Sequence, residues 1–125
     1  MDFHSNKSIY LQLADTIKER IIQGEYRESD KIPSVREFAS KMGVNPNTIV
    51  RTFNELQTMN IIENKRGIGY FVREHAKAII IKEKKVDFFE KIFPEFIRQA
   101  DLLGITQDEI IKYLNQVKEE NNEKR

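Results

Sequence analysis

A short segment near the middle of the sequence concentrates side chains that can hydrogen-bond to DNA bases. It carries Asn47, Thr48, Arg51 and Asn54. At this spacing the four residues share one face if the segment is an α-helix, and we call that face the reading face. In the DNA major groove, arginine can bond guanine through two atoms, and asparagine can do the same with adenine. The pattern therefore indicates sequence-specific recognition of DNA.

The residue types argue against catalysis and metal binding. The sequence contains no cysteine, and its histidines are His4 and His75. No nucleophile, base and orienting group stand at a suggestive spacing, and a metal-ligand cluster needs more cysteine or histidine than this. We therefore expect no enzymatic activity, no metal and no cofactor.

Two simpler interpretations of the reading face stay open when the segment is considered alone. Arg51 can pair with Glu55 four residues on, which would leave a solvated face with no ligand. Thr48 can hold a phosphate instead of a base, assisted by the free N–H groups at the start of the helix. The elements around the segment favour DNA recognition.

The reading face belongs to the second helix of a predicted helix-turn-helix. Ser34 and Glu37 have the spacing of a capping box, which begins the first helix of the motif, and Gly43 ends it. Asn45 is a good cap for a second helix over residues 46–59. Its core-facing side should carry Ile49, Thr52, Phe53 and Leu56. Two helices joined by such a short turn predict a helix-turn-helix.

A helix and a hairpin flank this motif. Residues 8–23 carry apolar residues at steps of four, which predicts an amphipathic helix. Over residues 61–72, β-branched and aromatic residues surround the basic turn Lys65-Arg66-Gly67, which predicts a β-hairpin in the position of a wing. The expected fold class is mainly α with a small β-hairpin. A winged helix-turn-helix over residues 1–77 would be followed by a short two-helix dimerisation tail over residues 78–125.

Positive charge is concentrated where this motif lies. Residues 31–73 hold seven basic and three acidic residues, a local charge of +4, although the whole chain has a net charge of only +1. Affinity for phosphate depends on such local clustering. The predicted DNA contacts are Ser34, Arg36, Asn45, Asn47, Thr48, Arg51, Lys65, Arg66 and Gly67.

The tail is predicted to be helical and to hold two copies of the chain together. Pro94 should kink a helix over residues 85–103, and Thr106 begins a second capping box; the charged residues from Glu119 onward should be frayed. Residues 79–81 fit either a strand or the start of the long helix. A tail this rich in apolar residues cannot bury them alone. The expected dimer seam comprises Phe88, Ile92, Phe93, Phe96, Leu103, Ile110 and Leu114. Packing of the phenylalanines back onto the winged helix is the alternative.

The length and the hydropathy pattern bound the class of protein. With 125 residues the chain can hold one compact domain and an appendage, which excludes a large enzyme fold. The first eight residues are mostly polar, and no apolar run approaches the length of a signal-peptide core or a membrane span. We expect a cytoplasmic protein with no membrane partner.

Several short motifs together resemble the DNA-binding domain of GntR-family regulators. They lie at residues 9–13, 24–26, 32–39, 44–51 and 66–72. The resemblance implies that Arg36, Thr48 and the Arg66-Gly67 wing tip occupy contact positions of the family motif. The sequence departs from the family pattern at Ser8, Ser29, Val50 and Asn60. Many relatives have arginine where this chain has Val50, so a base preference cannot be transferred from them.

The short tail resembles that of the YtrA-type branch of the same family. This resemblance implies dimerisation through the tail and a gene neighbourhood that contains an ABC transporter. We therefore predict a homodimeric repressor that binds a pseudo-palindromic double-stranded operator. The competing hypothesis is a winged helix that docks a protein partner, which would tolerate charge reversal at Arg36 and Arg66 unless the partner were acidic. The sequence identifies no small-molecule effector.

Overall fold

A computed structural model describes residues 7–123 as two compact units, and His4 lies outside the described residues. The first unit ends at Lys84 and the second begins at Lys85. We call them the head unit and the tail unit. The division between the two units lies inside helix α4, Ala76–Asp87. The boundary expected after residue 77 lies in the same helix, and the assignment of separate functions to the two parts stays a prediction.

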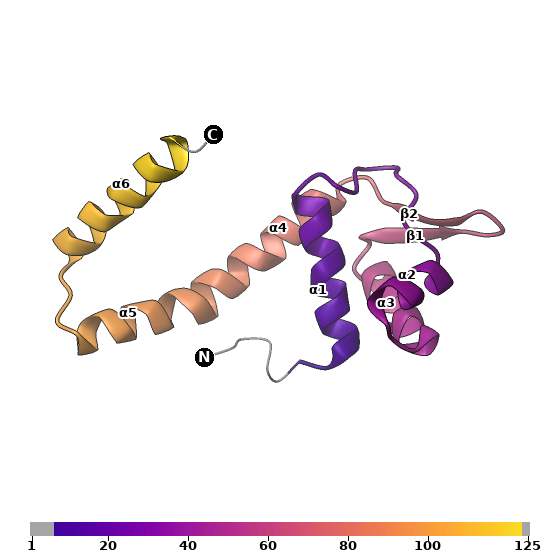
Figure 1. The fold of residues 1–125 in the computed structure, drawn as a ribbon, viewed down its shortest axis with the longest axis horizontal. Helices are drawn as coiled ribbons and strands as arrows, with labels where there is room; N and C mark the ends of the chain where they lie inside the picture. The colour runs from indigo at the N-terminus through magenta and orange to yellow at the C-terminus, as the bar shows by residue number, and fades with distance from the viewer. Residues whose placement is uncertain (1–6, 124–125) are drawn as a thin grey trace. The chain divides into compact units, whose positions relative to one another are not determined.

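Helices α1 (Ile9–Ile22), α2 (Val35–Met42) and α3 (Pro46–Thr58) build most of the head unit (Figure 1). The predicted capping box is present at α2, where Ser34 Oγ accepts the Glu37 N–H and Glu37 Oε1 accepts the Ser34 N–H. Gly43 then adopts φ 66°, a left-handed conformation that glycine takes without steric cost, and α2 ends there. The predicted helix-turn-helix is confirmed.

The predicted hairpin is also confirmed, and a third backbone segment runs beside it. Strands β1 (Ile62–Lys65) and β2 (Gly69–Val72) are antiparallel, with Ile62 opposite Val72. The segment before α2 bonds to the outer edge of β2, because the Ile32 N–H donates to the Tyr70 carbonyl at 3.0 Å and the Val72 N–H donates to the Asp30 carbonyl at 2.9 Å. These bonds attach the base of the hairpin to the segment that precedes α2.

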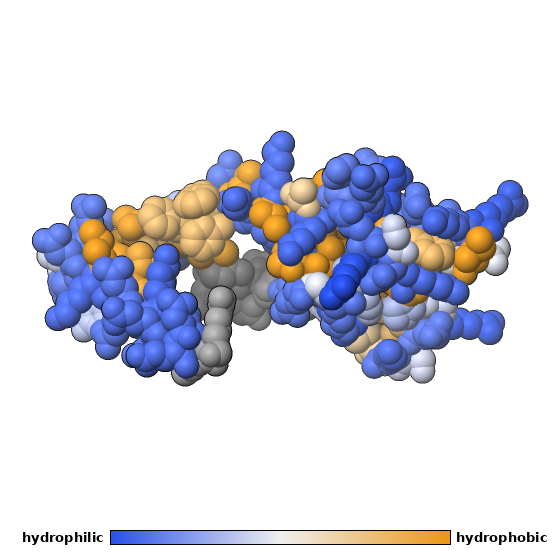
Figure 2. Space-filling view, turned by 90° about the horizontal axis from the view of Figure 1, so that it is seen from above, coloured by the Kyte–Doolittle hydropathy of each residue, from blue (hydrophilic) through white to orange (hydrophobic). Residues whose placement is uncertain are grey.

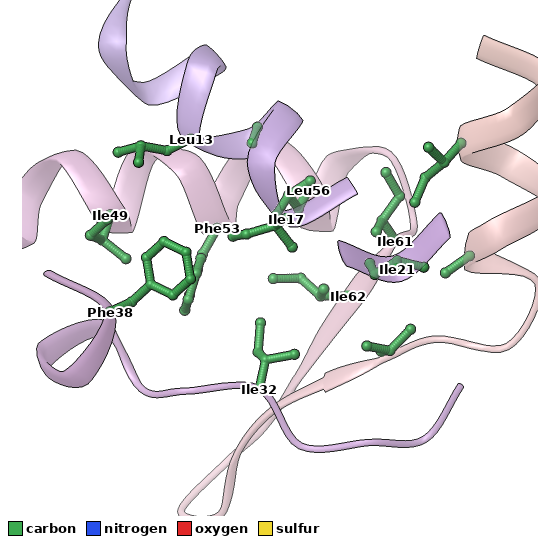
Figure 3. Packing of buried hydrophobic residues seen from close by; sticks show 14 of the residues in the cluster. Leu13, Ile17, Ile21, Ile32, Phe38, Ile49, Phe53, Leu56, Ile61 and Ile62 are labelled. Carbon is green, nitrogen blue, oxygen red and sulfur yellow. The ribbon is translucent and has the colours of Figure 1, made fainter. Parts of the chain in front are cut away.

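The core of the head unit is formed by α1, α2, α3, the hairpin and the start of α4 (Figure 3). The face of α3 predicted to point inward, Ile49, Thr52, Phe53 and Leu56, is fully buried. Phe53 contacts Phe38 of α2 edge to face at 6.1 Å and Tyr70 of β2 at 4.7 Å, so one ring joins three elements. Because this side of α3 is locked into the core, its opposite side must face outward.

Residues 79–81, which fitted either strand or helix in the sequence, lie inside α4. Ala76 and Ile80 stand four residues apart and are both buried against the core. This spacing is helical, and burial on one side of the helix outweighs the strand preference of three consecutive isoleucines.

The tail unit contains the end of α4, a π-helical turn η1 (Phe88–Ile92), and the helices α5 (Phe93–Leu102) and α6 (Gln107–Glu123). The π turn ends two residues before Pro94, which has no N–H and whose ring crowds the carbonyl four residues back, at Glu90 within the turn. The second capping box is confirmed, since the Thr106 N–H donates to Glu109 Oε1 at 3.1 Å. Fraying was expected from Glu119 onward, but α6 continues to Glu123; the two residues after it lie outside the described residues.

Candidate nucleic-acid interface

The outward side of α3 carries the reading face, as the buried side requires. Asn47, Arg51 and Asn54 are exposed, and Thr48 is half-buried. The Asn45 side chain accepts the Asn47 N–H at 2.8 Å and so caps the helix. This bond uses the amide oxygen of Asn45, which leaves its NH₂ group as the part that can bond to a ligand.

Arg51 has a partner that sequence reasoning missed. Its guanidinium lies over the ring of Tyr10 in α1, 4.1 Å from the ring centre. The alternative in which Arg51 pairs with Glu55 is not what the structure shows, since no ion pair joins them among residues 7–123. No local pattern reveals this contact, because Tyr10 lies on a different helix.

The start of α2 carries two further predicted DNA contacts, Ser34 and Arg36. They differ in whether the side chain is already engaged within the protein. The Ser34 hydroxyl is engaged in the capping box. The backbone and side-chain hydrogen bonds from Ser34 hold the pKa of Glu37 below its usual range, so this carboxylate stays ionised at the helix N-terminus. Arg36 is exposed, and within the described part of the chain no ion pair occupies its charge. Arg36 is therefore available to a phosphate or a base edge.

At the wing tip, Lys65, Arg66 and Gly67 are all exposed. Lys65 Nζ lies 4.4 Å from the centre of the Phe71 ring and 4.0 Å from a Glu63 oxygen, so its charge is partly balanced within the hairpin. Gly67 has φ 78°, which lets the chain turn tightly beside Arg66. Of the two cations at the wing tip, Arg66 is therefore the more available for contact with DNA.

In the tail unit, the predicted seam residues lie together around an apolar hollow of about 630 Å³ between α5 and α6. All seven line it: Phe88, Ile92, Phe93, Phe96, Leu103, Ile110 and Leu114. Figure 2 shows the apolar surface of this unit in orange and tan. Tyr113 and Val117 also line the hollow and were missed, although they continue the helical spacing of Ile110 and Leu114.

Other kinds of site have no support in the described structure. Among residues 7–123, no group of three or more His, Asp or Glu side chains is placed to hold a metal ion. The helices of that range include none long and apolar enough to cross a membrane.

Comparison with known proteins places this arrangement among transcriptional regulators. Residues 9–72 match the profile of the family described as "Bacterial regulatory proteins, gntR family". The chain is 43% identical to the HTH-type transcriptional regulator YhcF of Bacillus subtilis, over 88% of this chain and 89% of that protein. It is 31% identical to the HTH-type transcriptional repressor YtrA of the same organism, over 94% and 89% respectively.

A solved structure agrees with these matches. A GntR-family transcriptional regulator from Bacteroides thetaiotaomicron superposes with a TM-score of 0.74 and 42% identity, covering 90% of this chain and 99% of that one. These relatives are regulators rather than enzymes, and the likeness extends through the tail.

Proposed function

The chain belongs to the GntR family of DNA-binding bacterial regulators, and from this premise we propose that it is a homodimeric repressor of a pseudo-palindromic operator. The observation that carries the proposal is the division of α3 into two sides. One side is fully buried in the core, and the other presents Asn47, Arg51 and Asn54 to solvent. A helix held this way can enter the major groove without loss of core packing.

The predicted contacts then divide into two classes. Arg51 and the exposed asparagines carry the donor and acceptor groups that read base edges. Thr48, Ser34 and Arg36 lie at the starts of α3 and α2, where free N–H groups and the helix dipole favour phosphate. Arg66, beside the bare backbone of Gly67, suits the minor groove or the adjacent phosphates.

Two observations support repression by a dimer. The tail unit exposes an apolar hollow that a second copy of the tail can cover, which would pair two reading heads on two half-sites. YtrA, a relative along most of the chain, is named a repressor. The resemblance of the tail to the YtrA-type branch also supports an ABC transporter operon as the target, and such a regulator would act in the cytoplasm.

The test begins by selecting, from a random duplex library, the DNA that the purified chain retains. Arg51→Ala should weaken binding to the selected duplex by about 1–3 kcal/mol and weaken binding to a scrambled duplex much less. Fluorescence anisotropy at fixed salt measures both, because phosphate contacts make affinity depend on salt. Arg27→Ala, which removes an exposed arginine of the loop after α1, is the control and should change neither. An equal loss on both duplexes with Arg51→Ala would show that Arg51 holds phosphate only.

A further inference from the structure

The contact between Tyr10 and Arg51 joins the first turn of α1 to the middle of α3. The guanidinium carbon lies 4.1 Å from the centre of the half-buried Tyr10 ring. At this distance the aromatic face attracts the cation. The hydrogen-bond donors of a guanidinium lie in its own plane, so stacking covers the face and leaves the donors free. An ion pair with Glu55 would have used those donors instead.

The backbone of Tyr10 is attached to α3 by a buried threonine. Thr52, which follows Arg51 in α3, is fully buried. Its hydroxyl lies 2.8 Å from the Tyr10 carbonyl and 3.0 Å from the Thr48 carbonyl, and its one proton is shared between these acceptors. The backbone of Tyr10 is therefore hydrogen-bonded to the residue next to Arg51, which fixes the point on α1 from which the ring extends toward Arg51.

We propose that Tyr10 is a positioning residue that orients the Arg51 guanidinium for contact with DNA before DNA arrives. The inference rests on the proposed function, since it assumes that Arg51 touches the duplex. An unstacked arginine must lose its side-chain freedom when it binds, whereas an arginine already held on a ring has lost much of it. Tyr10 therefore strengthens operator binding without touching DNA.

The experiment is a double-mutant cycle on the full chain, with the selected and scrambled duplexes as probes. Tyr10→Leu keeps an apolar side chain and removes the ring, and it should weaken binding to the selected duplex about two- to fivefold, the range expected for an exposed cation–π pair. Tyr10→Phe keeps the ring face and should bind as the wild type does. In an Arg51→Ala background, Tyr10→Leu should cause no further loss.

Each result decides for or against the positioning role. A loss with Tyr10→Leu that persists in full in the Arg51→Ala background overturns it, because the effect would then be a general defect of the fold. The positioning role is also overturned if Tyr10→Phe, which keeps the ring face, binds the selected duplex more weakly than the wild type does. If Arg51→Ala weakens both duplexes equally while the cycle still shows coupling, base reading fails and positioning stands. If Arg51→Ala leaves both affinities unchanged, neither proposal survives.

Discussion

At the scale of single residues, Thr52 is unusual for a side chain in the middle of a helix because it is both fully buried and hydrogen-bonded to two carbonyls. It is 0% exposed, and its hydroxyl bonds to two carbonyls, one of them on another helix. Thr58 is its natural comparison, because its hydroxyl also bonds a carbonyl four residues back, that of Asn54 at 2.9 Å, but it is exposed. Water can replace the bond at Thr58 and cannot replace it at Thr52.

Thr52→Val should therefore lower the free energy of unfolding by about 1 kcal/mol, because the hydrogen bond from the hydroxyl of the buried Thr52 is lost while the volume of the side chain is kept. Thr58→Val, the matched control, should change it by less than about half of that. Urea unfolding of both variants at 25 °C measures the difference. Equal losses at the two positions would mean that burial of the hydroxyl is not what matters.

The residue scale also shows where sequence reasoning succeeds and where it stops. Thr52 was placed on the buried side of its helix because helical periodicity fixes which residues share a face. The only protein partner weighed for Arg51 lay on the same helix, at Glu55, as the alternative to DNA recognition, because local pairing rules consider neighbours one turn away. The actual partner, Tyr10, is brought to Arg51 by the packing of α1 on α3, which leaves no trace in the local pattern.

At the scale of elements, a charge cluster joins α4 to α1 within the head unit. Asp15, in the middle of α1, is 6% exposed and is bonded by Lys7 at 2.7 Å and by Lys84 of α4 at 2.8 Å. A second pair, Lys18 with Glu83 at 2.8 Å, lies beside it. These bonds and the buried Ile80 hold the last part of the head unit against α1.

The cluster makes stability depend on pH. Burial alone raises the pKa of Asp15, but hydrogen bonds from Lys7 and Lys84, together with their charges, outweigh burial and leave the pKa below its usual value. A carboxyl whose pKa is lower in the folded chain than in the unfolded chain favours folding when ionised. This contribution is complete above the unfolded pKa of about 3.9 and is lost as the pH falls through the lower folded pKa.

Asp15→Asn should thus lower the free energy of unfolding at pH 7 by about 1–3 kcal/mol, because Lys7, Lys84 and Lys18, which lies 3.9 Å away, lose a charged partner that is itself buried. The gap between variant and wild type should narrow as the pH is lowered below about 4, where the carboxyl of the unfolded chain becomes protonated, and it should close as the pH falls through the lower folded pKa. Urea unfolding across that pH range tests both statements. Asp101→Asn, at an exposed aspartate of α5, should have little effect at any pH. A gap that stays constant with pH would contradict the electrostatic account.

Elements differ in how far the sequence reveals them. The boundaries of α2, α3 and α6 follow from caps such as Ser34 and Thr106, whose bonds reach only three residues along the chain. The π turn before Pro94 was anticipated only as a kink, because the sequence locates the steric conflict and not how the backbone relieves it. The cluster around Asp15 joins residues 69 positions apart and was not foreseen at all.

At the scale of the whole molecule, the two units differ in how completely they bury their large apolar side chains. The head unit has a closed core, whereas the tail unit leaves large side chains around an open hollow. The seven seam residues named from the sequence all line that hollow, because η1, α5 and the residue after α5 supply five of them and α6 supplies Ile110 and Leu114. The second copy that would cover the hollow stays a prediction.

Two adjacent leucines at the end of α5 offer a sharp test of this assembly. Leu102 is 72% exposed and Leu103 is 75% exposed, yet only Leu103 lines the hollow. Leu103→Glu places a charge where the partner copy is expected, and burying an unpaired charge is strongly unfavourable, so it should dissociate the dimer. Leu102→Glu adds the same charge next to it and should leave the dimer intact. Sedimentation velocity over a range of protein concentrations measures both.

Operator binding should follow the oligomeric state. A dimer engages two half-sites at once, and the second contact gains from a high effective concentration. Leu103→Glu should therefore lose at least about tenfold in affinity for a full operator and little for a duplex that holds a single half-site. Leu102→Glu should match the wild type on both. If Leu103→Glu remains dimeric, or if both variants dissociate alike, the hollow is not the seam and the two reading heads must be paired by another surface.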